Sequence, residues 1–160
     1  MKKTEKGFTI IEVALVLAIG ALIFLVIFLA VPALQRNQRN DARKRDISNV
    51  SEAVHDYNAN HPTKAFSNGQ VYNTSGPDKT KDLGAYLDTL STNIENVTVY
   101  DATNTLPSAP SAADLTQIRV MKGKQCDSLS AIKTGSTRQA AIVGAVENAG
   151  GQTWYCQSAN

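Results

Sequence analysis

The two cysteines have the most obvious chemistry, because a pair of thiols can form a disulfide or bind a metal ion. Cys126 and Cys156 both lie in the polar C-terminal part of the 160-residue chain. Asp127 follows Cys126, but no histidine is near either cysteine, so the remaining ligands of a metal site are missing. In an exported protein, such a pair is most simply one disulfide.

A second candidate for chemistry is the segment "SLSAIKTG". It contains Ser130-x-x-Lys133 and Lys133-Thr-Gly135, which are similar to the active-site boxes of penicillin-recognising enzymes. Those enzymes need the two boxes on separate elements, whereas here the boxes share one lysine. We therefore interpret the match as a coincidence and predict no catalytic residues and no enzyme.

The two histidines give no metal site either. His55 and His61 are six positions apart, so they do not share one helix face. The sequence also contains no glycine-rich phosphate-binding loop. We expect no metal and no cofactor.

The basic stretch from Arg36 to Arg45 raises the question of nucleic acid. Asp41 and Asp46 are interleaved with these cations, no aromatic residue lies within the stretch, and the net charge of the chain is only +2. Phosphate-binding surfaces combine stronger positive charge with aromatic stacking. Nucleic-acid binding is possible but not indicated, and we predict a solvated or inter-subunit surface. Three N-glycosylation sequons begin at Asn49, Asn73 and Asn96, a pattern that often arises by chance.

A long apolar segment near the N-terminus has one acid at its edge. From Val13 to Leu34, 22 residues contain no charge and no side-chain amide. As a helix they span about 33 Å, enough to cross a bilayer. A cleaved secretory signal has a shorter apolar region and a small-x-small site, which is missing here. Glu12 stands just before the segment, where a carboxylate without a partner is costly.

The orientation of this segment does not follow from charge alone. Positive residues precede it at Lys2, Lys3 and Lys6, and more follow it between Arg36 and Arg45. The count would place the C-terminal side in the cytoplasm, whereas the cysteine pair indicates export.

The helical pattern continues past the apolar segment in polar form. One helix face carries Ile47, Val50, Val54 and Tyr57. Asn58, Asn60 and His61-Pro62 then mark a stop. We expect one helix from Phe8 to Tyr57, with a hydrophobic transmembrane part at 8–34 and an amphipathic continuation at 35–60. Gly20 and Pro32 weaken a helix and are the expected break points.

Residues 61–160 are expected to form a globular head. After a Gly-Pro-Asp start signal, the spacing of four apolar residues predicts one face of an amphipathic helix, formed by Leu83, Tyr86, Leu87 and Leu90. The predicted strands are 96–101, 115–121, 138–147 and 152–157, with a tight hairpin at Asn148-Ala-Gly-Gly151. The fold class is α+β, with a small antiparallel sheet of about four strands packed on the long helix.

The segment "KGFTIIEVALVLAIGAL" resembles the class III signal peptide of type IV pilins and pseudopilins. The shared pattern is a basic leader ending in Gly7, then Phe8-Thr9, then Glu12 at the fifth position after the glycine, then the apolar segment. The resemblance covers about the first 35 residues closely. It extends loosely to the long helix and the C-terminal cysteine pair.

The resemblance implies how the chain is processed and assembled. A prepilin peptidase would cut between Gly7 and Phe8, remove residues 1–7 and methylate the new Phe8 amine. The N-terminus would be cytoplasmic and the head exported, which overrides the charge count. Glu12 would contact the Phe8 amine of a neighbouring subunit in a filament built through the N-terminal helices. An inner-membrane assembly platform is implied, and a melted helix segment in the filament would lie between Gly20 and Pro32.

The implied function is a structural subunit of a type IV pilus, serving adhesion, motility or DNA uptake. A pseudopilin of a type II secretion system is the alternative, and the cysteine pair favours a pilin because many pilins have a disulfide-bounded C-terminal loop. A signal-anchored extracytoplasmic enzyme or binding domain would not need the Gly-Phe-Thr-x-x-Glu spacing. The expected location is the membrane for the precursor and then an extracellular filament.

Overall fold

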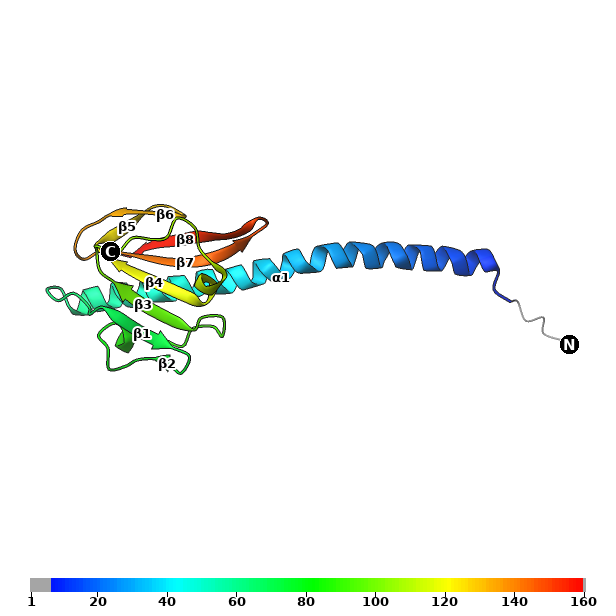
Figure 1. Cartoon of the computed structure of the whole chain (residues 1–160). Coiled ribbons are helices and arrows are strands. Elements are labelled where there is room, and N and C mark those ends of the chain that lie inside the picture. Colours follow the sequence, from blue (N-terminus) through cyan, green and yellow to red (C-terminus); the bar gives the residue numbers. More distant parts are fainter. Residues whose placement is uncertain (1–6, 160) are drawn as a thin grey trace. The chain divides into compact units, whose positions relative to one another are not determined.

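The computed structural model describes residues 7–159, and the chain divides into two units, Met1–Gln38 and Arg39–Asn160 (Figure 1). Of the expected leader, only Gly7 lies within the described residues. One helix, α1, spans Ile10–Asn60, close to the range expected from the sequence. Residues 39–160 are called the globular domain below.

The first unit presents the apolar part of α1. Its large apolar side chains are exposed in the single chain, from Phe8 at 89% to Leu34 at 59%. By length and composition, α1 is able to cross a membrane. The helix runs through Gly20 and Pro32 without interruption, so neither residue breaks it in the single chain. A break within a filament stays a prediction.

The globular domain contains more strands than the four expected from the sequence. A six-stranded sheet has the order β2-β1-β3-β4-β7-β8, and β5 and β6 form a second, two-stranded sheet. The bounds are β1 Gly69–Asn73, β2 Gly76–Pro77, β3 Asn96–Tyr100, β4 Gln117–Lys122, β5 Lys124–Ser128, β6 Ala131–Thr134, β7 Ala140–Asn148 and β8 Gly151–Ala159. All four predicted strands exist, as β3, β4, β7 and β8.

The sheet is not purely antiparallel, because β3 and β4 run parallel. Their connection carries the 3₁₀ helix η2, Ala112–Thr116, and returns the chain to the same end of the sheet. A parallel pair requires such a crossover instead of a tight turn. The predicted hairpin between β7 and β8 is confirmed, with Asn148 paired to Gly151.

The predicted helical pattern at residues 83–90 is wrong. Only one 3₁₀ turn forms, η1 at Gly84–Tyr86, and Leu87 is already extended. Gly84 lies so close to the backbone of Asp78 that a Cβ would overlap the Asp78 carbonyl. The apolar side chains are nevertheless buried, since Leu83 and Leu87 have no exposed surface. Close backbone contact and burial therefore decide the conformation here, not helical periodicity.

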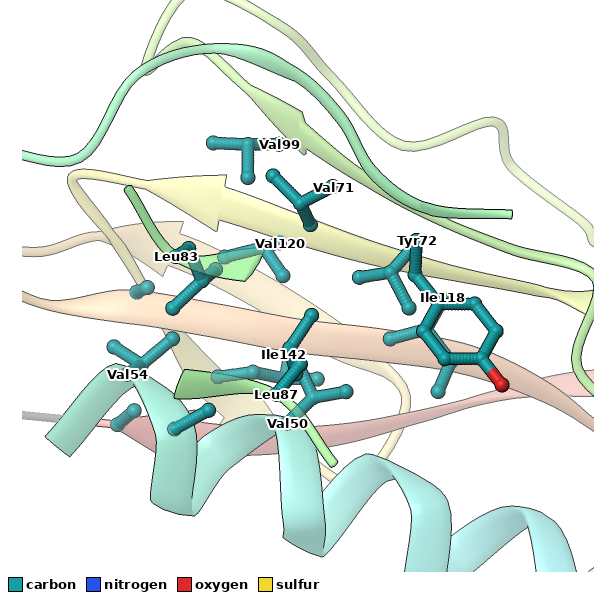
Figure 2. Close-up of a cluster of buried hydrophobic side chains, with 14 of the residues drawn as sticks. Val50, Val54, Val71, Tyr72, Leu83, Leu87, Val99, Ile118, Val120 and Ile142 are labelled. Carbon is teal, nitrogen blue, oxygen red and sulfur yellow. The ribbon is translucent and has the colours of Figure 1, made fainter. Parts of the chain in front are cut away.

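One face of the sheet packs on the C-terminal part of α1 (Figure 2). Val50 and Val54 point from the helix toward Val120 and Ile142 of the sheet, and all four are fully buried. Leu83 and Leu87 complete this core. Burying an aliphatic side chain of this size contributes about 1.5–3 kcal/mol, so this contact supplies much of the stability of the domain.

The opposite face carries a second core around Trp154, which includes Met121, Val143 and Cys156. The guanidinium of Arg119 lies over the Trp154 ring, 5.5 Å from its centroid, and pairs with Asp114. Trp154 donates from Nε1 to the carbonyl oxygen of Pro107 at 2.9 Å. These contacts hold the β3–β4 connection on the sheet.

Polar contacts fix α1 to the end of β7. Glu147 accepts from Arg39 at 2.7 Å and from Arg43 at 2.9 Å, and Arg43 is almost fully buried. Asn40 binds both the backbone N–H and the carbonyl of Glu147. The two hydrogen bonds from Arg39, together with the one from Arg43, hold the pKa of Glu147 at about 2, below its ordinary 4.5.

A buried carboxylate on α1 makes a second polar attachment. Asp46 is 4% exposed and accepts from the backbone N–H of Ser91 at 2.9 Å and from the Ser91 hydroxyl. A buried carboxylate needs such partners to offset its lost hydration. The contact ties the segment before β3 to the helix.

Candidate functional site

The first candidate site is the start of α1. The resemblance to pilins predicts cleavage and contact between subunits at this position. Gly7, Phe8 and Thr9 precede the helix, which begins at Ile10. A Cβ added at Gly7 would meet nothing within 4 Å, and Phe8 is 89% exposed. In the single chain, the expected cleavage position is therefore open to solvent.

Glu12 does not lack a partner at this position. Its Oε2 atom accepts from the backbone N–H of Thr9 at 2.8 Å and from the Thr9 hydroxyl at 2.8 Å. The Thr9 hydroxyl oxygen in turn accepts from the backbone N–H of Glu12 at 3.3 Å. This reciprocal arrangement is a capping box, which satisfies backbone donors that have no partner in the first turn of a helix.

The capping role of Thr9 was missed in the sequence, although its signal is present. Thr9-x-x-Glu12 followed by an apolar run is the sequence pattern of a capping box. Glu12 also lies in the first turn, where a negative charge interacts favourably with the helix dipole. Among the described residues, no donor contacts the second carboxylate oxygen, Oε1.

The apolar surface that follows Glu12 is the largest exposed apolar surface in the described part of the chain. It runs along α1 to Leu34, and among residues 39–159 only Leu129 is another large apolar side chain with comparable exposure. Extended apolar surfaces of this kind mark contact with a membrane or with other proteins. The surface thus has the character needed both for a bilayer and for helix packing.

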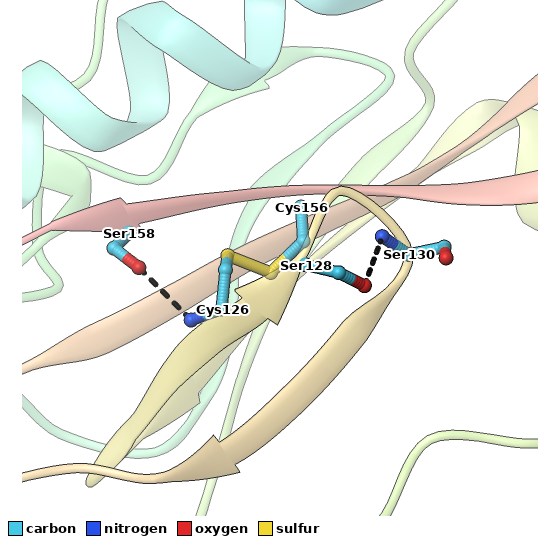
Figure 3. Close-up of a disulfide and its surroundings, with 5 residues drawn as sticks. All are labelled: Cys126, Ser128, Ser130, Cys156 and Ser158. Atoms are coloured by element: carbon cyan, nitrogen blue, oxygen red, sulfur yellow. Dashed lines mark hydrogen bonds between the residues drawn. A yellow bond between two sulfur atoms is a disulfide. The ribbon is translucent and has the colours of Figure 1, made fainter.

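The second candidate feature is the disulfide (Figure 3). Cys126 of β5 and Cys156 of β8 are joined, with their Cα atoms 5.8 Å apart, so the pairing predicted from the sequence is present in the structure. None of the four predicted strands contains Cys126, which lies in β5 of the second sheet.

Two hydrogen bonds reinforce this attachment. The backbone N–H of Cys126 donates to the Ser158 hydroxyl at 2.9 Å, and the N–H of Cys156 donates to the Leu129 carbonyl at 2.7 Å. The β5–β6 hairpin is therefore held on β8 by one covalent bond and by these two hydrogen bonds. Its tip exposes Leu129 to solvent.

The residues that resemble catalytic boxes are engaged in other contacts. Lys133 pairs with Asp127 at 3.0 Å, and both side chains are more than half exposed. The backbone N–H of Ser130 donates to the Ser128 hydroxyl.

His61 stacks on Tyr57 with 4.4 Å between ring centroids. Within residues 7–159, no group of three or more His, Cys, Asp and Glu side chains is arranged to hold a metal ion.

The basic stretch is partly used inside the globular domain. Arg39 and Arg43 bind Glu147, and the Lys44 ammonium lies 5.4 Å from the centre of the Tyr155 ring. These cations attach α1 to β7 and β8. Their arrangement gives a structural reason for the cluster that needs no nucleic acid.

Comparison with known families agrees with the site at the start of α1. Residues 2–28 match the family described as the prokaryotic N-terminal methylation motif. No curated protein and no solved structure matches the chain. The motif marks pilin-like structural subunits, and together with the apolar helix it fits a membrane-anchored precursor that is exported into a surface filament. The chain therefore carries a class III signal peptide, the N-terminal segment characteristic of type IV pilins and pseudopilins.

Proposed function

We propose that this chain is a type IV pilin, a structural subunit that polymerises into a surface filament. The observation that carries the proposal is the methylation motif leading directly into an exposed apolar helix that continues into a disulfide-containing globular domain. A pseudopilin of a type II secretion system shares the motif. The disulfide near the C-terminus favours the pilin.

In this proposal, prepilin peptidase cuts between Gly7 and Phe8, and the Phe8 amine is methylated. The processed subunit stays in the membrane through α1 until an assembly platform adds it to the filament. Phe8 is exposed, and among the described residues a Cβ added at Gly7 would meet nothing within 4 Å, which supports access for the peptidase. Removal of residues 1–7 also leaves Thr9 next to the new amine.

Glu12 is proposed to set the axial position of each added subunit. One carboxylate oxygen caps the helix through Thr9, which leaves Oε1 for the methylated Phe8 amine of a neighbouring subunit. Methylation keeps the positive charge of an amine. Two unit charges 4 Å apart attract by about 4 kcal/mol at an effective dielectric of 20, so a misplaced subunit loses a substantial interaction.

Two variants separate the assembly role of Glu12 from its capping role. Glu12→Gln keeps a side chain able to close the capping box but removes the charge. Thr9→Val removes the cap and keeps the charge, at a cost of about 1 kcal/mol to the helix start. We expect filament yield to fall strongly in Glu12→Gln and to stay near wild type in Thr9→Val, with normal amounts of processed protein in both.

The measurements are the yield of sheared filaments, immunoblots of the membrane fraction, and intact mass of the filament subunit. The expected mass is that of a chain beginning at N-methylated Phe8. Normal filament yield in Glu12→Gln together with filament loss in Thr9→Val would contradict the charge role and leave only capping. Filaments whose subunits retain Met1 to Gly7 would contradict the processing. Loss of protein secretion without any loss of surface filaments in a deletion strain would favour the pseudopilin.

A further inference from the structure

The proposed function leaves three Asn-x-Ser/Thr sequences unexplained, at Asn49, Asn73 and Asn96. In exported proteins this sequence is the acceptor for N-linked glycans, and its use requires an exposed segment. The sequence alone does not separate the three. The structure does, because they lie in three different conformations.

Two of the three are held in regular structure. Asn49 lies within α1. Ser51, the hydroxyl residue of the same sequon, is only 2% exposed. Asn96 begins β3, which is paired on one side with β1 and on the other with β4. Presenting either sequence to an enzyme would require breaking helix or sheet hydrogen bonds, which makes both poor acceptors.

Asn73 is different, because it is the last residue of β1 and its sequon continues into the turn of the β1–β2 hairpin. Asn73 pairs with Gly76, so Thr74 and Ser75 are the two loop residues, and all three residues of the sequon are exposed. The Asn73 side-chain oxygen accepts from the backbone N–H of Ser75 at 2.8 Å. Among the described residues, nothing accepts from its amide nitrogen, Nδ2. The Asn73 amide nitrogen and the Ser75 hydroxyl therefore both belong to exposed residues of the same hairpin.

The edge position of this turn leaves room for a large modification. β2 is the outermost strand of the six-stranded sheet and is only two residues long. Beside the turn lies a groove of about 490 Å³, within the range of small-molecule sites. Its lining includes four residues that carry hydroxyls: Thr74, Ser75, Thr89 and Thr92. These hydroxyls suit a sugar ring, whose groups both donate and accept hydrogen bonds.

We propose that Asn73 is the acceptor of an N-linked glycan whose first sugar lies along this groove. The donor is a saccharide activated as a diphosphate. The Asn73 amide nitrogen bonds to the anomeric carbon, the bond from that carbon to the diphosphate oxygen breaks, and the amide proton passes to a base of the transferase. The proposal rests on export of the globular domain, which is part of the proposed function.

The test is peptide mapping of the full chain purified from the cells that produce it. Trypsin separates the three sequons, because Asn73 falls in Ala65–Lys79, Asn49 in Asp46–Lys64 and Asn96 in Asp82–Arg119. We expect sugar masses on the first peptide and none on the other two. An intact mass beginning at Phe8 shows in the same sample that the chain was processed, so failure of the glycan is distinguishable from failure of the pilin proposal.

Variants of the sequon residues make the assignment specific. Asn73→Gln and Ser75→Ala should each abolish the added mass, and Ser75→Thr should retain it because the hydroxyl is kept. Asn96→Gln is the matched control and should leave the mass unchanged. An unmodified Ala65–Lys79 peptide overturns the proposal. Sugar that persists in Asn73→Gln overturns it as well, since it would then be attached to a hydroxyl.

Discussion

Glu147→Gln removes the one negative charge shared by two arginines of α1. Arg39 is 44% exposed, but the Arg43 side chain is only 8% exposed and would be left buried without its counter-charge. The glutamine amide oxygen still accepts one hydrogen bond, while the bidentate contact with Arg39 is lost. The variant therefore tests whether this ion pair stabilises the attachment of α1 to β7.

The pKa of Glu147 sets the size of the effect. Its lowering from 4.5 to about 2 corresponds to about 3 kcal/mol, since each pKa unit is worth about 1.36 kcal/mol. Water screens the exposed Arg39 partner, which reduces this value. We expect Glu147→Gln to lower the free energy of unfolding by about 2 kcal/mol at pH 7.

The pH dependence has a definite sign. A carboxylate whose pKa is lower in the folded state stabilises the fold above its unfolded pKa and loses this effect as the pH falls through the folded pKa. The gap between wild type and Glu147→Gln should therefore be complete above about pH 5.5 and should fall to less than half its size by about pH 3.

The assay is urea unfolding of the full chain in detergent, followed by fluorescence. Trp154 is the single tryptophan and is 5% exposed, so the signal reports the globular domain. Glu52→Gln on the exposed face of α1 is the matched control and should change the free energy by less than about 0.5 kcal/mol. A gap that is absent at pH 7, or equally large at pH 3, would refute the reasoning.

Three further changes test separate parts of the domain by the same unfolding measurement. Cys156→Ser should lower the free energy of unfolding by about 3 kcal/mol, and a reducing agent should destabilise wild type but not the variant. Gly84→Ala should cost about 2 kcal/mol or more through its overlap with the backbone, while Gly150→Ala, whose Cβ has space, should be near neutral. Ser91→Ala leaves buried Asp46 without its hydroxyl donor and should cost about 1–3 kcal/mol, and an unchanged midpoint would show that the contact contributes nothing.

The elements with strong periodicity were predictable from the sequence. Ile47, Val50, Val54 and Tyr57 are all buried, as their spacing on one helix face indicates. The four predicted strands, β3, β4, β7 and β8, also have enough apolar or β-branched residues to be recognised. The N-terminal motif was predictable from the spacing of Gly7, Phe8 and Glu12, and residues 2–28 match the methylation-motif family.

The elements that were missed lack a local signal. β5 is "KQCDS", which has no alternation of apolar and polar residues, and it is fixed by the disulfide and by its pairing with β6. β1 contains only two buried residues, Val71 and Tyr72, between turn-rich flanks. The parallel pairing of β3 with β4 depends on the path of the connecting chain, which strand composition does not specify.

The core on α1 joins residues from the beginning and the end of the globular domain. Ile47 and Ala159 belong to the same buried cluster, and β8 completes the sheet. Synthesis at about 5–20 residues per second leaves the apolar face of the helix uncovered for several seconds before β8 emerges. The core on the helix is therefore complete only when the last strand is present. A chain truncated before β8 would leave part of the buried cluster around Ile47 exposed to solvent.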